Sequence, residues 1–145
     1  MLSVNCKSVL YGMQTIIPYF KQQSRGHVIN VTSLLSHMRI AAQLYSMYSA
    51  SKAALNSLTA NKHTDIQKDG YNKIQISLFI PGTTATDFAA NAINSIGNYN
   101  MTNPYAQPVD DVAKKIVHLI HKLAMYSKVI YYILVEVFSL TSSFK

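Results

Sequence analysis

A tyrosine and a lysine in the stretch YSASK, Tyr48 and Lys52, stand four residues apart. On an α-helix, residues i and i+4 lie on the same face, because each turn takes about 3.6 residues. A free phenol has a pKa of about 10, which is too high for ready proton exchange at neutral pH. An ammonium group one turn away stabilises the phenolate and lowers that value. The pair is therefore suited to general acid or base chemistry at a carbonyl or an alcohol, with Tyr48 as the acting group.

Two more polar residues lie in the stretches that follow apolar segments typical of buried strands. Ser33 ends the stretch NVTS after residues 27–31, and Thr86 lies in PGTTAT after residues 73–80. Ligands of open α/β sheets bind beyond the carboxyl ends of the strands. Because the helix between these strands carries the tyrosine and the lysine, we expect all four polar side chains to converge on one crevice. Ser33 would hold the substrate oxygen there by a hydrogen bond.

Hydrophobic periodicity predicts the elements that would position these residues. They are expected at residues 3–20 (helix), 27–31 (strand), 45–67 (helix), 73–80 (strand) and 108–123 (helix). A helix between two near-continuous apolar strands is the order of a parallel α/β sheet. We expect Gly26 to be the turn residue before the first strand and residues 84–103 to form a partly helical loop. Residues 129–140 are compatible with a strand followed by a short helix.

Composition limits the possible classes of protein. The 145 residues are 49% hydrophobic and 13% charged, which is typical of one compact domain. The net charge is +7, but the basic residues are scattered along the chain, so we expect no nucleic-acid partner. We expect His118 and His121 to lie on a solvent-exposed face of a helix, and we expect no metal site. The single Cys6 excludes an internal disulfide and favours a reducing, intracellular compartment.

The two ends of the chain bear on localisation. The N-terminus has neither a basic leader nor a long apolar run, so no signal peptide is expected. Residues 123–140 are strongly apolar, but Lys128 and Glu136 interrupt them, which argues against a spanning helix. We expect the apolar tail, residues 123–145, to form core or interface, with peripheral membrane contact as the alternative. The protein would then be cytoplasmic or membrane-associated.

Taken in chain order, the stretches NVTS, YSASKAAL and PGTTAT resemble the motifs of the short-chain dehydrogenase/reductase family. The stretch VN, which ends at Asn5, is similar to the asparagine that the family carries on an upstream helix. The resemblance covers about residues 1–120. It implies that Ser33, Tyr48 and Lys52 form the catalytic triad. Asn5 would be the fourth member, supporting the lysine through a water in a proton relay.

The resemblance also implies a nicotinamide cofactor, NAD(P)(H), with NADP(H) slightly favoured. Tyr48 and Lys52 would hold the nicotinamide ribose. The backbone around Pro81 and Gly82, together with Thr86, would contact the nicotinamide and the pyrophosphate. The implied activity is reversible hydride transfer between this cofactor and a small-molecule carbonyl or secondary alcohol.

Two finer expectations follow from the same resemblance. The stretch GHVINVTSLLSH and the apolar tail are similar to the hydroxysteroid dehydrogenase branch, which implies a lipid-like or steroid-like substrate. The family also implies a homo-oligomer, in which the helices bearing Asn5 and Tyr48 pack against a second subunit. The small side chains of ASKAAL suit such a close helix contact.

The spacing of the predicted catalytic residues departs from the family pattern. The interval from Ser33 to Tyr48 is two residues longer than usual, so either the loop is longer or Ser36 replaces Ser33. We prefer Ser33, because it directly follows the strand.

The five glycines, at positions 12, 26, 70, 82 and 97, cannot form a phosphate-binding GxxxGxG loop. We therefore expect residues 1–145 to be one partial domain, with a partial Rossmann-type parallel sheet that contains the later strands and helices only. The alternative function is a truncated, non-catalytic remnant that is inert or acts through subunit association.

Overall fold

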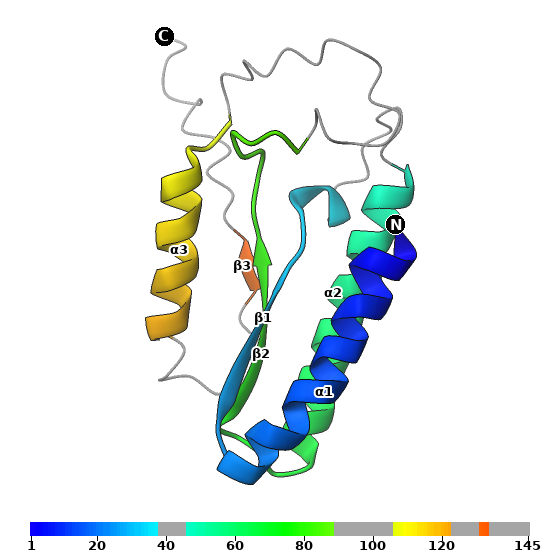
Figure 1. Ribbon diagram of the computed structural model, residues 1–145, viewed down its shortest axis with the longest axis vertical. Coiled ribbons are helices and arrows are strands. Elements are labelled where there is room, and N and C mark those ends of the chain that lie inside the picture. The colour runs from blue at the N-terminus through cyan, green and yellow to red at the C-terminus, as the bar shows by residue number, and fades with distance from the viewer. Residues whose placement is uncertain (38–45, 89–105, 123–130, 134–145) are drawn as a thin grey trace, which may run out of the picture.

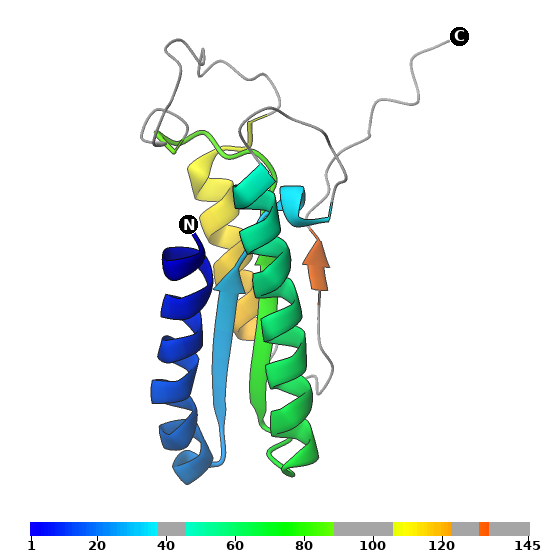
Figure 2. The same cartoon turned by 90° about the vertical axis from the view of Figure 1, so that its right-hand side faces the viewer.

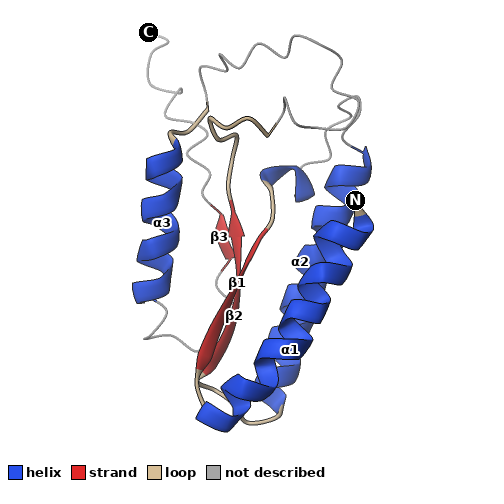
Figure 3. Cartoon of the chain, in the orientation of Figure 1, coloured by secondary structure: helices blue, strands red, loops and turns tan. Residues whose placement is uncertain are grey.

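The computed structural model describes residues 1–37, 46–88, 106–122 and 131–133. Within them, a parallel sheet lies between helices α1 and α2 on one face and helix α3 on the other (Figures 1 and 3). The predicted α/β class is confirmed, as is the partial Rossmann-type sheet.

The sheet has the strand order β1-β2-β3 in the described residues, and both pairings are parallel. The strands are β1 (Gly26–Val31), β2 (Ile74–Ile80) and β3 (Tyr131–Ile133), which lie side by side in Figure 2. β2 reads IQISLFI and is buried along its whole length, as expected of a central strand covered on both faces. The predictions for residues 27–31 and 73–80 are therefore confirmed to within one residue.

The helices also lie where periodicity predicts them. A π-helical turn, Ser3–Lys7, continues into α1 (Ser8–Gln23), and α2 (Ser46–Lys68) crosses over between β1 and β2. α3 (Val109–Lys122) follows β2 and carries Asp110 and Asp111 in its first turn, where the helix dipole favours negative charge.

The turn between α1 and β1 differs from the prediction. α1 continues to Gln23, and Ser24, rather than Gly26, takes the left-handed conformation with φ 55°. The amide of Arg25 donates to the carbonyl of Phe20 at 3.1 Å, which closes the helix end. Gly26 is instead the first residue of β1, where an added Cβ would lie 2.1 Å from Cγ of Phe20. The glycine is needed for close packing and not for the turn.

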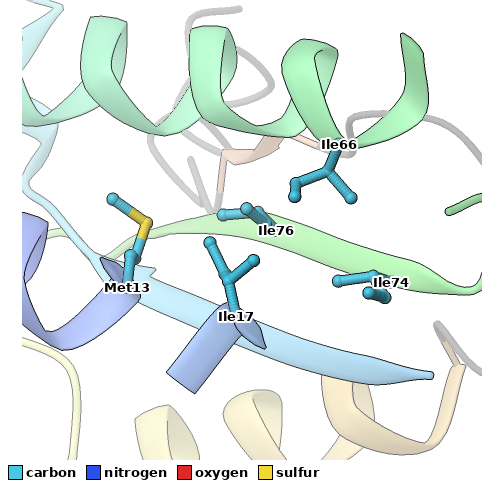
Figure 4. Close-up of a cluster of buried hydrophobic side chains, with 5 residues drawn as sticks. All are labelled: Met13, Ile17, Ile66, Ile74 and Ile76. Carbon is cyan, nitrogen blue, oxygen red and sulfur yellow. The ribbon is translucent and has the colours of Figure 1, made fainter. Parts of the chain in front are cut away.

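The main core lies between α1, α2 and the sheet. Figure 4 shows its side chains pointing toward one another from three elements, α1, α2 and β2: Met13, Ile17, Ile66, Ile74 and Ile76. On the opposite face, Phe79 of β2 packs against Leu119 of α3. Alternate residues of β2 therefore fill two separate clusters, which fixes α2 and α3 on opposite sides of the strand.

Several expectations fall partly outside the described residues. Residues 84–88 are not helical, and Thr84 forms a parallel bridge with Gln107; the remainder of the predicted 84–103 loop lies outside. β3 supports the strand expected within 129–140, whereas the helix expected after it and most of the apolar tail also lie outside. Of the helices described, none combines the length and hydropathy needed to cross a bilayer.

Candidate active site at the carboxyl end of the sheet

The first turns of α2 lie at the carboxyl ends of β1 and β2 (Figure 1). Tyr48 and Lys52 belong to these turns, Ser33 follows β1 by two residues, and Pro81 follows β2 directly. The fold thus gathers the predicted residues at one end of the sheet. This end is where open α/β sheets bind their ligands.

Lys52 reaches from α2 to the end of β1. Its Nζ donates a hydrogen bond to the carbonyl oxygen of Val31 at 3.0 Å and lies 5.9 Å from the centre of the Tyr48 ring. Burial lowers the pKa of Lys52 below its ordinary value, and the nearby Cys6 acts in the opposite direction. A half-buried ammonium beside a phenol is the electrostatic arrangement that acid–base chemistry at the tyrosine requires.

Asn5 approaches the same pair from the start of the chain. It lies in the π-helical turn Ser3–Lys7, and π turns within helices occur frequently at functional sites. Its Nδ2 donates to Oγ of Ser51 at 2.9 Å, and that hydroxyl donates to the carbonyl of Tyr48 at 2.7 Å. The predicted fourth member is therefore connected to the turn of α2 that carries Tyr48.

Ser33 and Ser36 both belong to the turn after β1. Ser33 caps the short 3-10 helix Leu34–Ser36, since its Oγ accepts a hydrogen bond from the amide of Leu35 at 3.3 Å. A hydroxyl that accepts in this way still has its own proton to donate to a substrate oxygen. The hydroxyl of Ser36 instead donates to the carbonyl of Ser33 and accepts from Nδ2 of Asn56. These contacts favour Ser36 as a support for the turn and leave Ser33 as the predicted catalytic serine.

The residues after β2 are arranged around the same end. The carbonyl of Pro81 accepts a hydrogen bond from the amide of Leu34 at 3.1 Å, which joins the two loops. Thr86 is exposed, and its Oγ1 accepts from the amide of Phe88 at 3.4 Å. The Phe88 ring lies 5.6 Å from the Tyr48 ring, so this loop reaches the predicted catalytic tyrosine.

Comparison with known proteins gives the family. The sequence model of the family described as "short chain dehydrogenase" matches residues 1–96, more than half of the chain. This chain belongs to the short-chain dehydrogenase family.

Similar curated proteins agree with this assignment. An uncharacterized oxidoreductase of Staphylococcus epidermidis is 30% identical over 121 residues, which cover 77% of this chain and 52% of the relative. One from Staphylococcus saprophyticus is 36% identical over 86 residues, which cover 59% of this chain and 35% of that protein. The chain thus spans about half, or less, of the length of these relatives.

Solved structures with a similar fold lie at lower identity. A short-chain dehydrogenase from Sphingobium yanoikuyae in complex with NADPH superimposes with a TM-score of 0.68 at 20% identity, covering 85% of this chain and 44% of that one. A short-chain dehydrogenase/reductase from Burkholderia phymatum in complex with NAD gives 0.57 at 22% identity, covering 88% and 44%. At such identities the likeness concerns the fold.

The polar groups gathered here suit the ribose and nicotinamide end of a dinucleotide. A phenol, an ammonium group and the hydroxyl of Thr86 are hydrogen-bonding groups of the kind that ribose and phosphate oxygens need. Gly82 adds a backbone without a side chain, where a Cβ would come 3.1 Å from Nε2 of Gln107. The chemistry of these groups therefore fits this part of the cofactor, whereas the sequence holds no glycine loop for its other end.

Sequence reasoning missed several neighbours of the site. Ser51 stands within YSASK, yet its contact with Asn5 joins residues 46 positions apart. Phe88 and Asn56 reach Tyr48 and Ser36 across the fold in the same way. The available signal was helical spacing, because Asn56 lies one turn after Lys52 on the same face.

Proposed function

We propose that this chain supplies the catalytic part of an NAD(P)(H)-dependent oxidoreductase that interconverts a carbonyl and a secondary alcohol. The observation that carries the proposal is the position of Tyr48 and Lys52. They stand one turn apart at the carboxyl end of a parallel sheet, in a chain of the short-chain dehydrogenase family. Fold alone does not define an activity, and the proposal therefore rests on these side chains.

The proposed mechanism assigns each residue one task. A nicotinamide cofactor held by these residues would supply or accept the hydride. During reduction, the Tyr48 hydroxyl gives its proton to the carbonyl oxygen, which becomes the alcohol oxygen. The Lys52 ammonium stabilises the phenolate that remains, and Ser33 donates a hydrogen bond to the same substrate oxygen. Asn5 supports Lys52 through a water, and in the oxidation direction each proton moves the opposite way.

Cofactor binding is proposed on the same residues. Tyr48 and Lys52 would hold the nicotinamide ribose, and Pro81, Gly82 and Thr86 would contact the nicotinamide and the pyrophosphate. We favour NADP(H) over NAD(H), since a chain of net charge +7 suits the additional phosphate.

A lipid-like substrate, of the kind used by the hydroxysteroid dehydrogenase branch, is the finer proposal. The support is sequence similarity in GHVINVTSLLSH and the exposed apolar ring of Phe88, which is 60% exposed while it contacts Tyr48. Turnover of small polar carbonyl compounds in preference to steroid ketones would contradict it.

We also propose a homo-oligomer that forms through α1 and α2, as the family resemblance implies. The outer surface of α1 and the turn before it expose large apolar side chains, including Val4, Tyr11 and Tyr19. We further propose peripheral membrane contact through residues 123–145. An intracellular, reducing location is also proposed, and the free thiol of Cys6 supports it.

The test is substitution of the proposed acid. Tyr48→Phe removes only the hydroxyl and should lower the rate of NAD(P)H consumption with a ketone panel by about 10²–10⁴-fold. Tyr19→Phe makes the same chemical change at an exposed residue of α1 and should leave the rate unchanged. A Tyr48→Phe variant with near wild-type turnover, or a wild-type chain without any turnover across the panel, would refute the proposal.

A further inference from the structure

Ser51 of α2 is completely buried where this helix packs against the π-helical turn. Its side chain is 0% exposed. Its Oγ accepts from Nδ2 of Asn5 at 2.9 Å and donates to the carbonyl of Tyr48 at 2.7 Å, so the hydroxyl acts as donor and acceptor at once. The adjacent Cys6 donates from Sγ to the carbonyl of Ser51 at 3.2 Å. One residue of α2 therefore holds two consecutive residues of the π turn.

The position of Ser51 in the helix gives these contacts a consequence. Ser51 lies three residues after Tyr48 and directly before Lys52, so its backbone connects the two members of the predicted pair. A shift of the π turn away from α2 would leave the Asn5 amide without its acceptor. It would also open the surroundings of Lys52, since Cys6 lies close enough to influence that ammonium group.

The groups facing Lys52 come from three elements. The carbonyl of Val31 from β1 accepts its hydrogen bond, the Tyr48 ring lies on its own helix, and the thiol of Cys6 comes from the π turn. Of these groups, Cys6 keeps its place near Lys52 only while the π turn stays against Ser51. The state of Lys52 therefore reports whether Ser51 maintains the arrangement.

We propose that Ser51 is a positioning residue of the candidate active site, whose buried hydroxyl fixes Asn5 relative to Tyr48 and Lys52. The proposal rests on the function proposed above and deepens it. Ser51 touches neither substrate nor cofactor in this role. It acts by holding two helices in register at the point where the reacting groups meet, and misplacement by about 1 Å is enough to lower a rate by about a hundredfold.

A purely structural role for Ser51 predicts a different result for the Ser51→Ala variant. Alanine is smaller than serine and is a better helix former, so Ser51→Ala would fold with little change if the hydroxyl only filled space. Under the positioning role, the same variant folds but leaves the Asn5 amide without an acceptor. The two roles are therefore separated by local readouts and not by the melting temperature.

The experiment compares the full chain with Ser51→Ala, and uses Ser57→Ala as the matched control because Ser57 is an exposed serine on the same helix. NMR of labelled lysine and asparagine side chains follows the titration of Lys52 and the amide of Asn5, assigned with Lys52→Arg and Asn5→Ala. In Ser51→Ala we expect the Lys52 midpoint to rise toward the ordinary lysine value, because the loosened turn admits water and burial influences the pKa of Lys52 more strongly than the opposing effect of Cys6 does. The Asn5 amide signals should move, and Ser57→Ala should reproduce the wild-type spectra.

Activity and rescue complete the test. With a ketone that the wild type reduces, Ser51→Ala should lower kcat by about 10- to 100-fold with KM unchanged, as expected when only transition-state alignment is lost. Ser51→Thr retains the hydroxyl and should restore the Lys52 midpoint. Unchanged Lys52 and Asn5 signals in Ser51→Ala, or a Ser51→Thr variant that resembles it, would overturn the proposal. A wild type without turnover refutes the proposed function, while the titration still decides the positioning role.

Discussion

His63 of α2 supplies a buried hydrogen-bond acceptor to the backbone of β2. Its ring is 3% exposed, and Nδ1 accepts a hydrogen bond from the amide of Ile76 in β2 at 3.3 Å. One turn later, Nε2 of Gln67 donates to the carbonyl of Ile74 at 3.0 Å. Alternate residues of a parallel strand present their backbone groups to the same side, so these two contacts serve the side of β2 that pairs with β3 further along, at Leu78–Ile80. The role requires an uncharged imidazole, because a protonated Nδ1 cannot accept.

Removing this acceptor should destabilise the fold. His63→Leu leaves the buried amide of Ile76 unpaired, and we expect the free energy of unfolding to fall by about 1–3 kcal/mol. His63→Asn is the matched variant, because its Oδ1 can take the place of Nδ1. Urea denaturation followed by circular dichroism measures both. Equal losses in the two variants would show that the volume of the ring, and not its hydrogen bond, is what matters.

The same residue predicts a pH dependence. Burial lowers the pKa of His63 below the ordinary histidine value of 6.5, and burial lowers the pKa of His27 likewise. The folded chain then binds fewer protons than the unfolded chain, so stability is lost as the pH falls below 6.5.

Denaturation across that pH range checks the sign. The wild type should lose stability from neutral pH toward mildly acidic pH. His63→Asn should lose less, retaining only the contribution of His27 and of the carboxylates. A wild type whose stability rises on acidification through this range would contradict the neutral, buried state of His63.

At the level of elements, the α1–β1 connection makes a paired glycine experiment possible. Gly26→Ala places a Cβ 2.1–2.6 Å from ring atoms of Phe20, and that ring packs against the main core. Because Cγ is fixed close to the backbone, the ring must swing away, and we expect a loss of about 1–3 kcal/mol.

Gly12→Ala provides the opposite expectation on the same helix. An added Cβ at Gly12 meets nothing within 4 Å, and alanine is favoured in a helix interior by about 0.5–1 kcal/mol. Thermal melting should therefore show Gly12→Ala above the wild type and Gly26→Ala below it. Two variants that melt alike would mean that Phe20 moves at little cost.

The elements themselves were predictable, because each carries a long hydrophobic pattern. Residues 73–80 are nearly all apolar, and β2 occupies Ile74–Ile80. The details of the connection were not predictable, since the left-handed residue could have been glycine and is Ser24. Turn preferences describe the local backbone conformation of a residue. Gly26 is instead required by a contact with another element, because the ring of Phe20 packs on it from α1.

The candidate site was likewise predictable only in part. Tyr48 and Lys52 follow from spacing on one helix, and their place at the carboxyl end follows from strand order. The contact between Asn5 and Ser51 depends on how two helices pack, and no local pattern encodes it. The roles of Asn5, Ser33, Tyr48 and Lys52 remain predictions, which the substitutions above address.

At the level of the whole molecule, two surfaces are open in the described residues. β2 lies between β1 and β3, so no described strand pairs with the other edge of β1. Such an edge offers unpaired backbone groups to a second chain. The outer side of α1 exposes Tyr11 at 59% and Tyr19 at 58%, which provides an apolar helix face on the same molecule. Both surfaces favour self-association, but by different contacts.

We expect the 145-residue chain to sediment as a dimer or larger species, with α1 at the contact. Tyr11→Glu places a charge on that helix at a position already exposed, so it should weaken association without unfolding the chain. Val117→Glu is the control, because Val117 is 50% exposed on α3, which covers the opposite face of the sheet. Sedimentation velocity over a concentration series measures all three chains. If Tyr11→Glu associates as strongly as the wild type, the helix face is not the contact and the edge of β1 becomes the better explanation. A wild type that stays monomeric throughout would exclude both.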